Sequence, residues 1–274
     1  MSLPAFEYRR PARLDEALAI LSSDPEARPL AGGQTLIPAL KQRLQRPSVL
    51  VDLQAIPEMQ GVEVTPTHVT IGAMTRHAVT AWDDRIAAAI PALSHLARGI
   101  AHSQVRHLGT MGGSIANNDP AADYPAALVG LGATVQTTRR AIPADDFFLG
   151  LFTTALEPGE LILRIRFPIP ARAGYHKFAN IASGYVTTGA FVSDGPAGLR
   201  VAINGAGPCV FRQTEAETRL SRDFSPAALE GFAQPEAGLN TDLHASAAYR
   251  AQLAAVAIRR ALAMALGQHA EPKP

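Results

Sequence analysis

Apolar and polar positions recur along this chain with two different periods, one typical of helices and one typical of strands. The first helical stretch carries Asp15 and Glu16 in its opening turn, where a helix dipole favours acidic side chains. Strands are indicated where apolar residues alternate, as at Val62 and Val64. The first third predicts, in order, a helix at residues 14–21, a strand at 28–31, a helix at 36–44, and strands at 49–53, 62–64 and 69–71.

The rest of the chain continues this mixture. Residues 86–101 have helical periodicity, and Pro91 is expected to kink or restart that helix. Gly, Ser and Asn dominate residues 102–120, which predicts a long loop. Further elements are predicted as a helix at 124–131, strands at 134–138, 161–167, 175–179, 188–192 and 199–204, and an Ala-rich helix at 244–266. The Pro-rich residues 167–174 predict a linker, so we expect an α+β protein in two parts divided near residue 172.

Composition narrows the class of protein. Hydrophobic residues make up 47% and charged residues 18%, enough for a substantial core. A formal net charge of +1 argues against a general nucleic-acid binder, which carries clustered Lys and Arg. No apolar run approaches the roughly 18 residues that would span a bilayer. Because the first residues also lack the basic-then-apolar order of a signal peptide, we expect a cytoplasmic protein.

A single cysteine, Cys209, excludes two kinds of cofactor from this chain. An iron–sulfur cluster takes four protein ligands, usually cysteines, and a structural zinc site takes a similar set. The two most closely spaced histidines, His102 and His107, lie in the predicted loop and form no metal-binding motif. No metal site is therefore predicted.

The first chemical feature is Ala31-Gly32-Gly33-Gln34-Thr35, between a predicted strand and a predicted helix. Two glycines let the backbone turn tightly and present several N–H groups on one side, which suits a phosphate. The alternative is a plain turn in which Thr35 caps the following helix.

The second feature is Gly109-Thr110-Met111-Gly112-Gly113-Ser114, within the predicted loop. A long loop in a compact domain is usually functional, and a second phosphate-facing segment fits a dinucleotide. Neither segment has the G-x-G-x-x-G form of a Rossmann site. Residues 112–116 resemble a nucleophile elbow only superficially, because that motif requires a strand before it and a helix after it, and both sides are predicted to be loop.

Asp123 follows in Asp119-Pro120-Ala121-Ala122-Asp123-Tyr124-Pro125. One interpretation makes it the N-cap of the next helix, with Pro125 in the first turn. The other makes it a carboxylate that accepts hydrogen bonds from a ribose or from nearby backbone. The two are compatible.

At these segments the sequence resembles a known family. The motifs AGGQTLIPALKQRL, TIGAMTRHAV and VRHLGTMGGSIANNDPAADYPAAL are similar to those of the FAD-binding medium subunits of the molybdenum hydroxylase, or xanthine dehydrogenase, family, and to the carbon monoxide dehydrogenase type in particular. The similarity continues through LEPGELILRIRFPIP to SAAYRAQLAAVAIRRAL and so covers essentially the whole chain. Together, in this order and at this spacing, the motifs are very specific for this family.

The resemblance implies a fold and a set of cofactor contacts. It implies an FAD-binding domain of the vanillyl-alcohol-oxidase (PCMH) type at residues 1–172, made of two α/β subdomains at about 1–55 and 56–172. It also implies a C-terminal domain at 173–274 with a small antiparallel sheet and helices. FAD would be bound non-covalently. The implied contacts are Ala31, Gly32, Gly33, Gln34, Thr35, Thr110, Met111, Gly112, Gly113 and Ser114 at the diphosphate, Asp123 at the adenosine side, Leu161 or Ile162 against the flavin or adenine, and Lys177 and Tyr185 near the isoalloxazine.

The resemblance also implies partners: a small subunit with two [2Fe–2S] clusters and a large molybdopterin subunit, assembled as a dimer of heterotrimers. The chain would pass electrons from the clusters to an external acceptor and would carry no catalytic acid, base or nucleophile. Between the positions of Lys177 and Tyr185, relatives commonly show basic residues and an Asp. This chain lacks those basic residues and the Asp, a change that bears on the flavin potential and the acceptor. The competing hypotheses are a standalone flavin oxidase and a scaffold protein that has lost its flavin.

Overall fold

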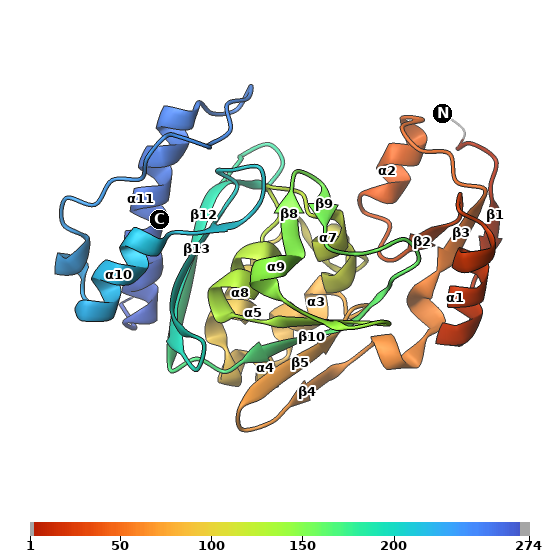
Figure 1. Ribbon diagram of the computed structural model, residues 1–274, viewed down its shortest axis with the longest axis horizontal. Helices are drawn as coiled ribbons and strands as arrows, with labels where there is room; N and C mark the ends of the chain where they lie inside the picture. Colours follow the sequence, from red (N-terminus) through yellow and green to blue (C-terminus); the bar gives the residue numbers. More distant parts are fainter. Residues whose placement is uncertain (1–2, 269–274) are drawn as a thin grey trace.

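The computed structural model describes residues 3–268, a mixed helix and sheet protein whose N-terminal and C-terminal parts lie at opposite ends (Figure 1). The helices are α1 (Leu14–Ser23), α2 (Leu36–Lys41), α3 (His77–Trp82), α4 (Asp84–Ala89), α5 (Pro91–Arg98), α6 (Ser103–Arg106), α7 (Met111–Asn117), α8 (Tyr124–Leu131), α9 (Ala144–Phe147), α10 (Thr214–Arg222) and α11 (Ala247–Ala265), with short 3-10 turns at Leu53–Ala55, Pro57–Met59 and Pro226–Leu229. The strands are β1 (Glu7–Arg9), β2 (Arg28–Leu30), β3 (Val49–Asp52), β4 (Val62–Val64), β5 (His68–Gly72), β6 (Thr134–Thr137), β7 (Ala141–Pro143), β8 (Phe148–Gly150), β9 (Thr153–Thr154), β10 (Ile162–Pro168), β11 (Arg172–Ala179), β12 (Val186–Gly195), β13 (Gly198–Asn204) and β14 (Phe211–Arg212).

The strands form four sheets. A parallel sheet of order β1-β3-β2 stands at the N-terminal end, and α1 and α2 supply its connections. An antiparallel sheet of order β4-β5-β10-β6-β7 lies in the middle, and a second antiparallel sheet, β11-β12-β13-β14, follows. The small hairpin β8-β9 completes the set. The first glycine segment (residues 31–35) therefore leaves the first sheet, while β10 belongs to the second.

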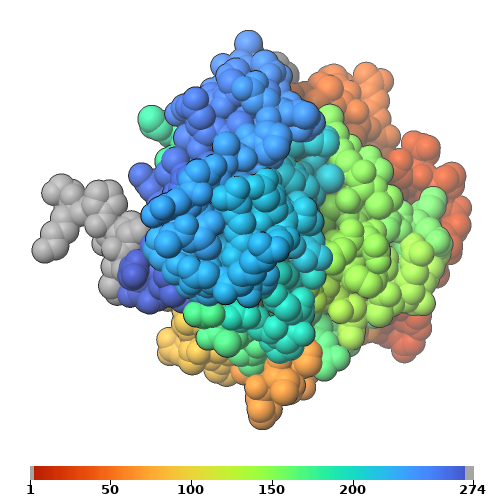
Figure 2. Space-filling model, turned by 60° about the vertical axis from the view of Figure 1, so that its left-hand side comes forward, coloured from red at the N-terminus to blue at the C-terminus, as the bar shows by residue number. Residues whose placement is uncertain are grey.

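The C-terminal sheet is buried on both faces. Phe191 in β12 belongs to the large core shared with α8, whereas its neighbour Val192 packs toward α10 and α11. This follows from strand geometry, since successive side chains point to opposite faces. The helix α11 can lie close to the sheet because Gly174 has no side chain. A Cβ at that position would sit 2.8 Å from the Ala265 nitrogen. Figure 2 shows the C-terminal residues forming a continuous surface on one side of the molecule.

Two glycines let α8 pack tightly between the sheets. A Cβ on Gly130 would lie 2.7 Å from the Phe191 ring, so glycine allows the close approach of α8 to β12. Gly132 ends the helix in the left-handed conformation, with φ +63°, a position that disfavours residues with a Cβ. The helix is buried along its whole length and begins directly after Asp123.

The prediction of a loop over residues 102–120 was wrong. The structure has α6 and α7 there, and the second glycine segment (residues 109–114) runs into the first turn of α7. Glycine has low helix propensity, but tertiary packing overrides it here. Met111 and Ile115 are fully buried. Gly112 packs against Ala73, the residue after β5, so closely that a Cβ on Gly112 would be 2.6 Å from the Ala73 Cβ.

Smaller differences concern where elements begin and end. The predicted helix at 36–44 ends at Lys41, and the one at 86–101 is two helices because Pro91 restarts it. The long helix begins at Ala247 instead of residue 244, because Ser246 caps its first turn. The predicted linker at 167–174 is mostly strand, since only residues 169–171 separate β10 from β11. The division into two domains near residue 172 stays a prediction. Residues 1–2 and 269–274, at the ends of the two predicted domains, lie outside the described part of the chain.

Within residues 3–268, no helix combines the length and the apolar character that crossing a bilayer requires.

Candidate functional site

The first glycine segment presents a row of free backbone amides. Leu30 still pairs with Asp52 of β3, and the chain then turns at Gly33, whose φ is +68°. Within the described residues, the N–H groups of four consecutive residues have no acceptor in the protein: Gly32, Gly33, Gln34 and Thr35. Unpaired amides in a glycine turn are a binding feature for an anion. The alternative that Thr35 caps α2 was wrong, because its side chain makes no capping hydrogen bond.

The second glycine segment has a different construction. Its amides are used within the protein: Met111 donates to Thr75 (3.1 Å), Gly112 to Ala73 (2.8 Å) and Ser114 to Thr110 (3.1 Å). The Gly113 amide donates to the Thr110 side chain (3.2 Å), so Thr110 is the N-cap of α7. This segment therefore offers a tightly packed surface and the Ser114 hydroxyl, not a second row of amides.

The helix over Met111–Asn117 was not foreseen, but it does not make residues 112–116 a nucleophile elbow. Ser114 lies inside α7 instead of on a sharp strand-to-helix turn, which that motif requires.

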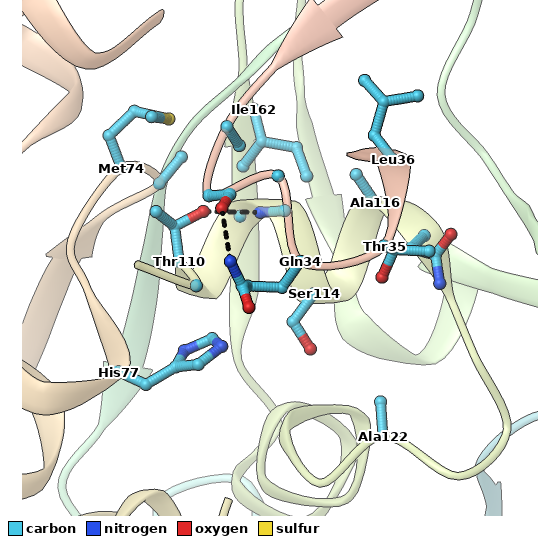
Figure 3. Close-up of a pocket in the computed structure, with 18 of the residues that line it drawn as sticks. Gln34, Thr35, Leu36, Met74, His77, Thr110, Ser114, Ala116, Ala122 and Ile162 are labelled. Carbon is cyan, nitrogen blue, oxygen red and sulfur yellow. Dashed lines mark hydrogen bonds between the residues drawn. The ribbon is translucent and has the colours of Figure 1, made fainter. Parts of the chain in front are cut away.

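The two glycine segments lie against each other. A Cβ on Gly113 would be 3.1 Å from the Ala31 Cβ, and one on Gly32 would be 2.5 Å from the Gly109 Cα. Both segments line a cleft of about 360 Å³, which Gly184 and Tyr185 of the loop between β11 and β12 also line. Figure 3 shows Gln34 between Thr110 and Ser114, with Thr35 and Leu36 further to the right. All the residues predicted to contact the cofactor line this cleft except Met111, which is fully buried in the core, and Lys177.

The remaining walls combine apolar and polar groups. Leu161 and Ile162, at the start of β10, are each 5% exposed and line the cleft. Tyr185 stands at the rim and is 46% exposed. These side chains can cover a planar ring, while the free amides of residues 32–35 can hold a negatively charged group further along the same cleft.

Asp123 does not act as a capping side chain. It occupies the position before α8 but makes no capping hydrogen bond, so that interpretation was wrong. Its Oδ1 instead accepts from the Tyr175 hydroxyl (2.9 Å) and pairs with the Lys177 ammonium (2.8 Å). Burial raises the pKa of the Asp123 carboxyl, and the charge of Lys177 opposes that rise. Lys177 thus lies behind the wall of the cleft, not in it.

His77 is a cleft residue that the sequence interpretation missed. Its ring is 5% exposed, packs 5.3 Å from the Tyr124 ring, and has no hydrogen-bond partner for Nδ1 in the described residues. Burial, together with the positive charge of Arg106, lowers the pKa of His77 to about 4. The imidazole is therefore neutral at physiological pH. In the sequence, the only sign of a role for His77 was its position within the family motif TIGAMTRHAV.

Comparison with known proteins identifies the family. A family profile described as the FAD binding domain in molybdopterin dehydrogenase matches residues 4–170. The nicotine 6-hydroxylase medium subunit of Paenarthrobacter nicotinovorans is 34% identical, and the match covers 96% of this chain and 98% of that protein. The carbon monoxide dehydrogenase medium chain of Afipia carboxidovorans is 35% identical over 94% of this chain and 96% of that one.

Solved structures agree with the sequence matches. The structure of reconstituted CO dehydrogenase from Oligotropha carboxidovorans contains a chain similar to this one, with a TM-score of 0.90 and 34% identity over 98% of this chain and all of that one. Quinoline 2-oxidoreductase from Pseudomonas putida 86 gives a TM-score of 0.88 with 33% identity over 98% of this chain and 99% of that chain. The predicted resemblance is confirmed: this chain belongs to the family of FAD-binding medium subunits of molybdenum hydroxylases, of the carbon monoxide dehydrogenase type, and is an oxidoreductase flavoprotein subunit.

Proposed function

We propose that this chain binds one FAD non-covalently in the cleft and passes electrons from the [2Fe–2S] clusters of a partner subunit to an external acceptor. The observation that carries the proposal is the row of four free amides at residues 32–35, packed against the second glycine segment at the wall of the cleft. A dinucleotide cofactor brings a diphosphate, the kind of anion that such a row of amides holds.

The residues fit FAD along the length of the cleft. The amides of residues 32–35 and the Ser114 hydroxyl would hold the diphosphate, and Asp123 would serve the adenosine side. Leu161 and Ile162 would lie against the flavin or adenine, with Tyr185 near the isoalloxazine. The second glycine segment would contribute close backbone packing and leave room for the diphosphate. Neither glycine segment contains a Cys or His that could link the flavin covalently.

The chemistry belongs to the cofactor, and the protein supplies placement and surroundings. When bound, FAD accepts electrons singly and releases them as a pair. The side chains of Leu161 and Ile162 would exclude water where they line the cleft, and the neutral His77 adds no charge to its lining. No side chain of this chain is assigned a proton-transfer or nucleophilic role.

We propose that the partners are a small iron–sulfur subunit and a large molybdopterin subunit, assembled as a dimer of heterotrimers in the cytoplasm. Relatives over nearly the full length of the chain are named as medium subunits or chains. With one cysteine this chain cannot supply the ligands of a cluster itself. The fold would divide near residue 172, with two subdomains of the PCMH type before that point.

The test is purification of the tagged chain from its native host, followed by identification of its companions. We expect two further polypeptides in equal amounts, iron and molybdenum in the complex, and FAD that acid denaturation releases through a filter. Purification of the chain with FAD but without iron, molybdenum or another polypeptide would contradict the subunit assignment. Flavin retained on the denatured chain would contradict the non-covalent assignment.

A further inference from the structure

Lys177 makes three hydrogen bonds behind the wall of the cleft. Its ammonium donates to the Gly99 carbonyl (2.8 Å) and the Gly184 carbonyl (3.1 Å), and it pairs with Asp123 Oδ1 (2.8 Å). An ammonium group has three N–H donors. All three therefore have acceptors within the protein, and none is left for a ligand in the cleft.

The two carbonyls belong to segments that face each other across the wall. Gly99 is followed by Ile100 and Ala101, which line the cleft, and Gly184 is followed by Tyr185 at the rim. The segments nearly touch, since a Cβ on Gly184 would lie 3.4 Å from the Ala101 Cα. Lys177 thus joins both segments to the buried carboxylate of Asp123.

The two segments differ in what else holds them. Arg106 donates to the carbonyls of Ile100 and Ala101, at 2.8 Å each, so that side is fixed independently of Lys177. The Tyr185 side is held by hydrogen bonds within its own turn, from the Gly184 N–H to the Asn180 carbonyl (2.8 Å) and from the Asn180 N–H to the Tyr185 carbonyl (2.8 Å). Residues 181–183 of that turn are exposed. Beyond the turn, the Val186 N–H donates to the Ala121 carbonyl (3.1 Å), and Lys177 joins the Gly184 carbonyl to the Gly99 carbonyl on the fixed side of the wall.

We propose that Lys177 is a positioning residue: by binding Gly99, Gly184 and Asp123 together, it holds Tyr185 at the rim of the cleft and so tightens FAD binding. The part that concerns FAD rests on the proposed function. The part that concerns the wall does not, because its contacts join residues of this chain to one another.

The experiment compares Lys177→Met with Arg172→Met in the full-length chain. Arg172 lies on the same strand and pairs with Asp194, away from the cleft, so its loss is a matched control. Amide hydrogen exchange is measured without ligand, and the FAD dissociation constant by flavin fluorescence. In Lys177→Met we expect exchange at Gly184 and Tyr185 to rise at least tenfold, with Ile100 unchanged, and the dissociation constant to rise at least tenfold. Arg172→Met should change neither.

A rescue separates the role of the ammonium from general damage to the fold. In a Cys209→Ser background, Lys177→Cys is alkylated with bromoethylamine while unfolded and then refolded, which restores an ammonium at nearly the original length. We expect slow exchange at Gly184 and tight FAD binding to return.

Three results would overturn the proposal: unchanged exchange at Gly184, faster exchange with unchanged FAD affinity, and no recovery after alkylation. Weaker FAD binding without faster exchange would mean that Lys177 contacts the flavin directly. If the unmodified chain binds no FAD, the proposed function fails, and the exchange data alone decide whether Lys177 holds the wall.

Discussion

Gly32 and Gly109 meet at the contact between the two glycine segments, where a Cβ on Gly32 would lie 2.5 Å from the Gly109 Cα. Backbone occupies the space that any side chain would need, so the contact can exist only with glycine at position 32. The same contact brings the free amides of residues 32–35 next to the start of α7. The shape of the cleft therefore depends on this approach of one backbone to another.

Gly32→Ala should push the two glycine segments apart. Since the obstructing atoms are backbone, we expect a loss of about 1–3 kcal/mol in the free energy of unfolding, as for other overpacked sites, and at least tenfold weaker FAD binding. Gly150→Ala is the control, because a Cβ there meets open space. Urea unfolding and FAD titration measure both effects. Equal FAD affinity in the two variants would show that the contact does not shape the site.

Gly33→Ala tests the turn that frees the amides. A φ of +68° costs a residue with a Cβ about 1–2 kcal/mol. Gly238→Ala makes a matched comparison, since Gly238 has φ +80° and open space around it. Both variants should lose similar stability in thermal unfolding, and only Gly33→Ala should lose FAD affinity. A similar loss of FAD affinity in Gly238→Ala would trace the effect to stability alone.

The two threonines should behave differently. The Thr35 hydroxyl has no partner in the described protein, so Thr35→Ala should leave stability nearly unchanged and weaken FAD binding roughly fivefold, the value of a hydrogen bond of about 1 kcal/mol. Thr110→Ala removes the cap of α7 and should cost about 1 kcal/mol of stability. Calorimetry and FAD titration separate the two effects. A destabilised Thr35→Ala would mean that its hydroxyl serves the fold.

His77 predicts a loss of stability in mild acid. Its pKa is about 4 in the folded chain and about 6.5 when unfolded, so above pH 6.5 neither state is protonated. As the pH falls from 6.5 to 4, the unfolded chain takes up a proton that the folded chain refuses, and about 3 kcal/mol is lost. Burial also lowers the pKa of His176 to about 4, so His176 contributes a similar loss of stability in the unmodified chain and in a His77→Gln variant. Urea unfolding at several pH values should show a shallower decline in His77→Gln, and identical declines would refute the assignment.

Local patterns predicted the elements that are regular in sequence. The helix α8 has the predicted bounds, because apolar residues fill it and Pro125 stands in its first turn. The strands β11 to β13 were recognised from their apolar runs. The helix α7 was missed, since its glycines and asparagine favour a loop and only its packing on Ala73 and the Thr110 cap make it helical. That packing joins residues far apart in the chain.

The candidate site followed the same division. The first glycine segment was found because a glycine pair between a strand and a helix has a physical meaning on its own, and the second because glycines and hydroxyls gather in a predicted long loop. The role of Lys177 could not be foreseen, because it depends on Gly99 and Gly184, which are 78 and 7 residues away. His77 was missed because a histidine beside apolar residues has no distinctive pattern until burial and Arg106 define its surroundings.

The most direct test of the account is anaerobic bleaching of the flavin by candidate organic substrates, with and without the partner subunits. The FAD-loaded chain alone should stay oxidised with every substrate, because one cysteine cannot hold a cluster and the molybdopterin site is proposed to lie on a partner subunit. Adding the iron–sulfur and molybdopterin subunits should then allow one substrate to bleach the flavin fully. Stoichiometric bleaching of the isolated chain by an organic substrate would contradict the account and make the protein a standalone flavin oxidase.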